Sequence, residues 1–206
     1  MSAAPQRVPY SVAARELLRN TLLDAACHEL ESRHWADITM ADIALAAGVS
    51  RQTLYKEFGS REEFAQVLVM REAERFLDAV EQAVGQHLAD PAKALAAAFD
   101  LFLTSAAENP LLRAVVLEEG AEELLALLTT QGKPLVERAA DRLTAVVIAG
   151  WPLIRRRDAE LLADVLVRLA ISYAALPKGD AATTAAAVSS LLQPYVEQLV
   201  RDTPAG

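Results

Sequence analysis

The sequence contains few of the residues that define specialised protein classes. Of its 206 residues, one is cysteine, three are histidine, eight are glycine and nine are proline, and aromatic side chains make up 5%. A single cysteine, Cys27, can neither close an internal disulfide bond nor anchor a thiolate zinc site, which favours a reducing compartment. We expect it to be a small buried hydrophobic residue. The low glycine and proline content excludes a collagen-like or low-complexity chain.

Long apolar runs are also absent. The longest, residues 143–154, is interrupted by Pro152, and it is shorter than the roughly 20 residues that cross a membrane. Residues 1–10 lack the apolar segment of a signal peptide. With 53% hydrophobic residues and a mean hydropathy of +0.19, the chain can still bury a sizeable core. We therefore expect a globular cytoplasmic protein with no membrane partner.

Charge is distributed unevenly along the chain. The formal net charge is −8 at pH 7, yet residues 1–61 contain seven basic and seven acidic side chains and are neutral. The rest of the chain therefore carries the entire negative excess. Acidic proteins are usually poor nucleic-acid binders, because phosphate contacts dominate affinity. DNA binding would require basic groups to gather on one face of residues 1–61.

Apolar residues recur at helical spacing almost everywhere, and no segment alternates in the manner of a β-strand. Serine and aspartate caps, with prolines at first helical positions, divide the chain into nine or ten helices, and Ser11 is the expected cap of the first. The fold class is therefore predicted to be all-α. The expected helices span residues 11–31, 39–47, 50–59 and 60–87, one begins at 91, and others span 110–117, 121–130, 134–149, 158–176 and 180–201.

Residues 40–59 contain the pattern of a helix-turn-helix. This motif needs a small residue where its helices touch, a glycine able to adopt positive φ in the turn, and a branched apolar residue in the second helix. Ala44, Gly48 and Leu54 occupy those places. Ser50 is the expected cap of the second helix. The outward residues of that helix are of types that contact bases or phosphates. They are Arg51, Gln52, Thr53, Tyr55 and Lys56.

With these residues the chain resembles the tetracycline-repressor (TetR) family of bacterial transcription regulators. The matching residues are Thr39, Asp42 to Ala44, Ala47 to Ser50, Thr53 to Tyr55, Phe58 to Ser60 and Glu62 to Phe64. The resemblance implies a helix-turn-helix DNA-binding domain in residues 1–59, with a flexible arm at 1–10. It also implies a helical effector-binding and dimerisation domain in residues 60–206, with the helix from Ser60 to His87 belonging to both parts.

Three positions depart from the family pattern. His34 stands where glycine is usual after the first helix, so we expect a non-glycine residue with positive φ there. Glu57 replaces a common phosphate-facing histidine, and its charge opposes phosphate contact. Arg61 replaces the usual lysine and preserves the cation.

The resemblance implies a homodimer bound to double-stranded DNA at a palindromic operator. Arg51 and Gln52 are the expected base readers, because the first residues of a recognition helix face base edges. Arg7 on the arm is expected to reach a minor groove. The full expected DNA-binding set is Thr39, Ser50, Arg51, Gln52, Thr53, Tyr55, Lys56 and Arg61.

Two apolar stripes are expected to form an intermolecular four-helix bundle, although such stripes bury equally well within one chain. The first consists of Leu162, Val165, Leu166, Leu169 and Tyr173, and the second of Val188, Leu192, Tyr195 and Leu199. The resemblance also implies a ligand cavity among the helices from about 91 to 176. There we expect Phe99, Phe102 and Trp151 to line a site for a hydrophobic small-molecule effector, with a filled core as the alternative.

Other functions have weaker support in the sequence. No catalytic constellation and no cofactor-binding motif stands out. The spacing Glu31-x-x-His34 occurs in di-iron bundles, but a metal site would need a second copy, which is absent. Two alternatives remain open: a DNA-binding regulator without an effector, and a carrier or scaffold bundle whose helix-turn-helix is only a packing motif.

Overall fold

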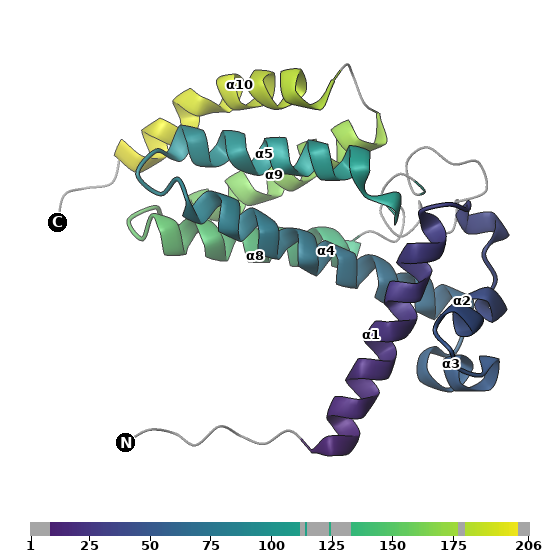
Figure 1. Cartoon of the computed structure of the whole chain (residues 1–206). Helices are drawn as coiled ribbons and strands as arrows, with labels where there is room; N and C mark the ends of the chain where they lie inside the picture. Colours follow the sequence, from purple (N-terminus) through teal and green to yellow (C-terminus); the bar gives the residue numbers. More distant parts are fainter. Residues whose placement is uncertain (1–8, 112–113, 115–123, 125–132, 177–179, 202–206) are drawn as a thin grey trace. The chain divides into compact units, whose positions relative to one another are not determined.

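The computed structural model describes residues 9–111, 114, 124, 133–176 and 180–201, and all regular structure within them is helical (Figure 1). The chain divides into two compact units, residues 1–68 and 69–206. The expected arm with Arg7 and most of the expected helices 110–117 and 121–130 lie outside the described residues.

The first unit is built around an apolar core. It contains α1 (Tyr10–Leu30), the 3-10 helix η1 (Trp35–Asp37), α2 (Met40–Ala46), α3 (Arg51–Phe58) and the start of α4 (Arg61–Gly85). Each of these elements contributes a buried side chain. The largest fully buried ones are Leu22, Trp35, Ile38, Ile43, Leu54, Phe64 and Leu68.

Side-chain caps define the helices around the turn. Thr39 and Asp42 form a capping box at α2: the Asp42 N–H donates to Thr39 Oγ1 (3.2 Å), and the Thr39 N–H donates to the Asp42 carboxylate (2.8 Å). The hydrogen bonds that the Asp42 carboxylate accepts from the Thr39 hydroxyl and from the Thr39 N–H lower the pKa of Asp42 from its ordinary value. Ser50 caps α3 by accepting from the Thr53 N–H (3.1 Å), as predicted. The predicted capping box before α4 is also confirmed, since the Ser60 N–H donates to Glu63 at 2.7 Å.

Two local expectations are wrong. Helix α1 begins at Tyr10, because the Pro9 carbonyl accepts the first helical hydrogen bonds, so Ser11 is not the cap. His34 has φ −74° and ψ 147°, which is extended backbone. The chain leaves α1 through this extended residue and turns in η1, where Trp35 is buried, so no positive φ is needed.

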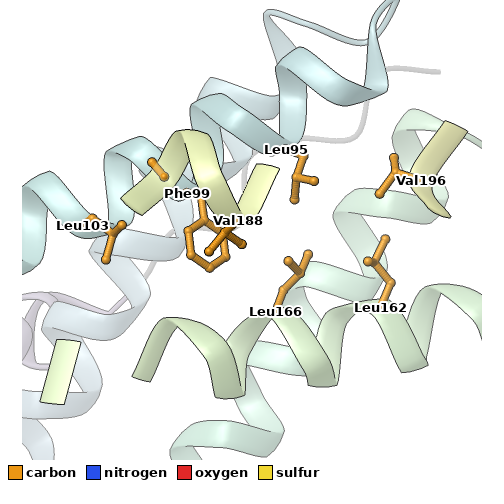
Figure 2. Packing of buried hydrophobic residues seen from close by; sticks show 8 residues of the cluster. Leu95, Phe99, Leu103, Leu162, Leu166, Val188 and Val196 are labelled. Atoms are coloured by element: carbon orange, nitrogen blue, oxygen red, sulfur yellow. The ribbon is translucent and has the colours of Figure 1, made fainter. Parts of the chain in front are cut away.

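The second unit contains the rest of α4 together with α5 (Pro91–Glu108), α8 (Lys133–Gly150), α9 (Arg156–Ala175) and α10 (Ala181–Arg201). Helix α10 packs on α5, α5 also contacts α9, and α9 packs against α8 (Figure 1). Figure 2 shows the core between α5, α9 and α10. Its labelled side chains are Leu95, Phe99, Leu103, Leu162, Leu166, Val188 and Val196.

Ion pairs join α4 to α8 within this unit. Arg142 of α8 donates to Glu74 (3.0 Å) and Glu81 (2.9 Å) of α4, and also contacts Asp78. The carboxylates of Glu81 and Asp78 raise the pKa of the Arg142 guanidinium. The C-terminal part of α4 is therefore held to α8 by several charges that share one arginine.

The turn between α2 and α3 depends on Gly48. Its φ is +69°, and the next N–H, that of Val49, donates to the Ala44 carbonyl at 2.9 Å. This hydrogen bond closes a Schellman-type helix end. A Cβ at Gly48 would meet no atom within 4 Å, so only the backbone conformation opposes a side chain there.

We expect Gly48→Ala to destabilise the protein by about 1–2 kcal/mol, the cost of a left-handed conformation for an L-residue. Gly85→Ala is the matched control, since Gly85 also has open space but lies in the last turn of α4. Urea unfolding followed by circular dichroism measures both changes. An unchanged midpoint for Gly48→Ala would contradict the role given to the turn.

Candidate functional site

Helix α3 presents a polar face to solvent. Leu54 and Phe58 are buried on its inner side. Arg51, Gln52 and Lys56 are exposed on its outer side, Tyr55 is 36% exposed, and Thr53 is half-buried. The structure therefore brings together all five outward residues predicted on this helix, on the face opposite the buried anchors.

Local contacts restrict several of these side chains. The Arg51 guanidinium lies over the Tyr55 ring at 5.3 Å from its centroid, and its Nη2 lies 3.4 Å from the Tyr55 hydroxyl. The hydroxyls of Ser50 and Thr53 are hydrogen-bonded at 2.8 Å. Gln52 and Lys56 are both exposed. The sequence predicts a base contact for Gln52 and a phosphate contact for Lys56.

Two predicted DNA-binding residues have structural partners of their own. Thr39 is exposed at the start of α2, where its hydroxyl donates to Asp42 at 2.7 Å. Arg61 is half-buried at the start of α4 and donates to the carbonyls of Trp35 (2.7 Å) and Ile38. It also lies over the Trp35 ring at 4.3 Å. Arg61 therefore joins α4 to the segment around η1, a role that sequence reasoning missed.

Glu57 also has partners that the sequence did not indicate. Its carboxylate accepts a hydrogen bond from Arg15 Nε of α1 at 2.7 Å, and its backbone carbonyl accepts one from Arg19 at 2.7 Å. The Arg19 guanidinium also lies over the Phe58 ring at 4.2 Å from its centroid. A cation at a helix C-terminus is favourable, so Arg19 stabilises the end of α3. These partners are separated in sequence by about 40 positions, and helical periodicity carries no signal for such a pairing.

The second unit contains a cavity of about 360 Å³. Side chains of α4, α5, α8 and α9 line it, and most of them are apolar. Phe99 and Phe102, two of the residues proposed to contact an effector, are among them. Trp151 is not part of the wall, and its indole Nε1–H donates to the Leu88 carbonyl at 3.1 Å.

A few polar side chains interrupt this lining. Glu72 and Arg75 of α4 contribute to the wall, as do Ser105 and Asn109 at the end of α5. Glu72 is largely buried and accepts hydrogen bonds from Arg75 Nη1 at 3.1 Å and from Arg71 Nε at 3.1 Å. The cavity therefore has an apolar body with a small polar region that includes a paired carboxylate.

The predicted dimer stripes are used in part by the chain itself. Leu162, Leu166 and Val188 are buried in the core of Figure 2. The half-buried residues of the stripes pack against that same core, and they are Leu169, Tyr173, Leu192 and Leu199. Leu162, Leu166 and Val188 therefore face inward, because α5 covers the side of α9 and α10 from which they project.

Both helices also keep large apolar side chains exposed. Leu161 and Val165 of α9 are 56% and 37% exposed, and Leu191 and Tyr195 of α10 are 75% and 37% exposed. Val165 and Tyr195 belong to the predicted stripes. Leu161 and Leu191 do not, because helical spacing alone does not tell which side of a broad apolar stripe faces inward.

The described residues contain no group of three or more histidine, cysteine, aspartate or glutamate side chains that could hold a metal ion. None of the helices in the described ranges is long and apolar enough to cross a membrane. Cys27 is half-buried, less than the full burial that was expected for it.

Known proteins match both parts of the chain. Residues 22–68 match the model of bacterial regulatory proteins of the tetR family, and residues 90–194 match that of the C-terminal domain of bacterial tetracycline repressors. The HTH-type transcriptional regulator AlkX of Mycobacterium tuberculosis is 36% identical over 196 residues, which are 95% of this chain and 93% of AlkX.

Solved structures agree with these matches. The TetR family repressor AlkX from a Dietzia species, described as implicated in biodegradation of n-alkanes, is 36% identical with a TM-score of 0.77, covering 88% of this chain and 96% of that one. RolR in complex with resorcinol shares the fold at 21% identity and a TM-score of 0.58, covering 94% and 98%. Regulators of this family bind DNA and act as dimers. The chain belongs to the TetR family of DNA-binding transcriptional regulators.

Proposed function

We propose that this regulator is a repressor that binds a palindromic operator as a homodimer and is released from it by a hydrophobic small molecule. The main support for DNA binding in this proposal is the polar face of α3. Burial of Leu54 and Phe58 on one side of the helix leaves Arg51, Gln52 and Lys56 exposed on the other. A short capped helix with this division fits the major groove, where arginine pairs with guanine and glutamine with adenine.

The individual DNA contacts follow from residue type and position. Arg51 and Gln52 begin α3 and are proposed to read bases, while Thr39, Ser50, Thr53, Tyr55, Lys56 and Arg61 are proposed to hold phosphates or the thymine methyl group. Of this set, Arg61 has least freedom to reach DNA, because its guanidinium is already bound to two backbone carbonyls.

We expect Gln52→Ala to relax base preference at one position of each half-site, since a bidentate pair contributes about 1–3 kcal/mol of discrimination. Lys56→Ala should weaken binding to every duplex alike and lower the salt slope by about 0.9, the value of one phosphate contact. Selection of bound sequences from random duplex DNA, followed by titration at several salt concentrations, measures both effects. The control is Lys133→Ala, an exposed lysine of the second unit.

The assignment of α3 fails if alanine variants of Arg51, Gln52 and Tyr55 all bind the selected duplex with wild-type affinity and preference. A regulator that reads DNA through α3 must lose one or the other.

The homodimer is proposed to bury the exposed apolar side chains of α9 and α10, which are Leu161, Val165, Leu191 and Tyr195. Isolated exposed leucines are common, but these four large apolar side chains lie on two helices that contribute to the same core, and a second copy would remove them from water. A symmetric dimer is expected to present two α3 helices to half-sites about 34 Å apart, one turn of DNA.

We expect Leu191→Glu to convert a dimer into a monomer, because it places an unpaired charge in the centre of an apolar interface. Leu17→Glu is the matched control, since Leu17 is 69% exposed on α1 of the first unit. Light scattering at micromolar concentration measures the mass, and circular dichroism checks that both variants remain helical. A wild-type protein that is monomeric under these conditions rejects the dimer.

The cavity supports the effector part of the proposal. Its volume of about 360 Å³ is within the usual range for small-molecule sites, and its lining is mainly apolar. The relative from Dietzia is a repressor implicated in n-alkane biodegradation, which favours an apolar chain compound for this protein too. A ligand weakens operator binding only by preferring the conformation that does not bind DNA, and a 100-fold change requires about 2.7 kcal/mol of preference.

We expect acyl chains and other straight-chain apolar compounds of graded length to release bound operator from the wild type. Ala98→Trp should abolish that release by filling the cavity while leaving DNA binding intact, because Ala98 lies in the wall. Ala145→Trp adds the same side chain at an exposed position of α8 and serves as control. Operator release is followed by fluorescence anisotropy of labelled duplex, and calorimetry measures binding of the compound itself. If no compound of the series binds the protein or releases the operator from it, the protein is a regulator without such an effector.

A further inference from the structure

Glu57 is an acidic side chain on the helix that is proposed to read DNA. It follows Lys56 directly, and the carboxylate is only 12% exposed. A lone carboxylate here would repel phosphates and would be costly to desolvate. The structure shows why it is tolerated: two arginines of α1, Arg15 and Arg19, surround it.

The two arginines contact Glu57 in different ways. Arg19 donates to the backbone carbonyl of Glu57 (2.7 Å) and is 4.0 Å from the carboxylate, so its main bond does not depend on the side chain. Arg15 donates to the carboxylate itself through Nε (2.7 Å). Arg19 therefore holds the end of α3 in place, whereas Arg15 is bound by the charge of Glu57.

Arg15 is the outer member of this cluster. Its side chain is 61% exposed, compared with 30% for Arg19. A guanidinium has five N–H donors in a planar fork that suits phosphate. Within the part of the chain that the structure describes, only the Nε donor of Arg15 makes a hydrogen bond. The four donors on its terminal nitrogens are thus available to an oxyanion that approaches α1 and α3 from solvent.

We propose that Arg15 is a DNA phosphate-binding residue and that Glu57 competes with the phosphate for its charge. The proposal rests on α3 being the DNA-reading helix. Before DNA arrives, Glu57 neutralises Arg15 and holds its side chain against α3. On the duplex, a backbone phosphate takes the free donors of Arg15, and the carboxylate reduces the gain. Glu57 therefore lowers sequence-independent affinity while leaving base reading to Arg51 and Gln52.

The test is a double-mutant cycle with Glu57→Gln and Arg15→Gln. Glu57→Gln removes the charge, keeps the size of the side chain, and leaves the carbonyl that Arg19 binds. We expect it to strengthen binding to operator and random duplexes alike by about twofold to fivefold, the range for one exposed charge pair. The salt slope should become steeper. Arg15→Gln should weaken binding to both duplexes, lower the salt slope by about 0.9, and remove the gain from Glu57→Gln when the two are combined.

Glu16→Gln is the matched control for net charge, because Glu16 is an exposed acid on α1 next to Arg15 in sequence. A gain with Glu16→Gln equal to that with Glu57→Gln, or a gain from Glu57→Gln that persists without Arg15, would overturn the proposal in favour of a general field effect. Loss of binding with Glu57→Gln would also overturn it, since the carboxylate would then be needed to position α3.

The variants distinguish a failure of the Arg15 proposal from a failure of the proposed DNA-reading role of α3. If Gln52→Ala changes base preference but Arg15→Gln leaves affinity and salt slope unchanged, α3 reads DNA and only the proposal for Arg15 fails. If none of these variants changes DNA binding, the assignment of α3 itself fails.

Discussion

Burial of Leu54 and Phe58 is the interaction on which the DNA-binding surface depends. Helix α3 has eight residues, which is too short to be stable in water by itself. Its conformation therefore comes from these two side chains in the core of the first unit and from the hydrogen bonds at its ends. Ser50 satisfies an N–H at the start, and Arg19 binds a carbonyl at the finish. With the inner face anchored, every outward residue acquires a defined direction.

The second unit distributes a large apolar surface among three uses. Part of it forms the core between α5, α9 and α10, part lines the cavity, and part is left on the outer face of α9 and α10. An apolar side chain that points inward and fills the core cannot also contact a second copy at the proposed dimer interface. Leu162 and Leu161 illustrate the division: they are adjacent in the chain, yet the first is 5% exposed and the second 56%.

Arginine side chains connect elements that the apolar cores do not join. Arg61 links α4 to the backbone around η1, Arg19 links α1 to the end of α3, and Arg142 links α8 to three carboxylates of α4. The planar fork of the guanidinium suits this task, since one side chain can reach several acceptors in fixed directions. In a chain with a net charge of −8, arginines that make such links have less freedom to reach DNA than unlinked ones.

Most of the local structure of this protein is predictable from the order of its residues. Helical periodicity, the caps Thr39, Ser50 and Ser60, and Gly48 in the turn could be recognised because each acts over a few residues, where the spacing along the chain is the spacing in space. The family pattern added the expected roles of the outward residues of α3. His34 shows the limit even at short range, because η1 turned the chain without the positive φ that the pattern suggested.

The face that each helix buries, and the residues that it contacts, depend on how the helices pack together. Periodicity shows that α9 and α10 are amphipathic, but packing of α5 determined that Leu162, Leu166 and Val188 point inward. The fold of the second unit also places the Trp151 indole against the Leu88 carbonyl, outside the cavity wall. The pairing of Glu57 with Arg15 joins residues 42 positions apart. Such contacts depend on how separate helices meet, and a pattern along one helix contains no information about its partner.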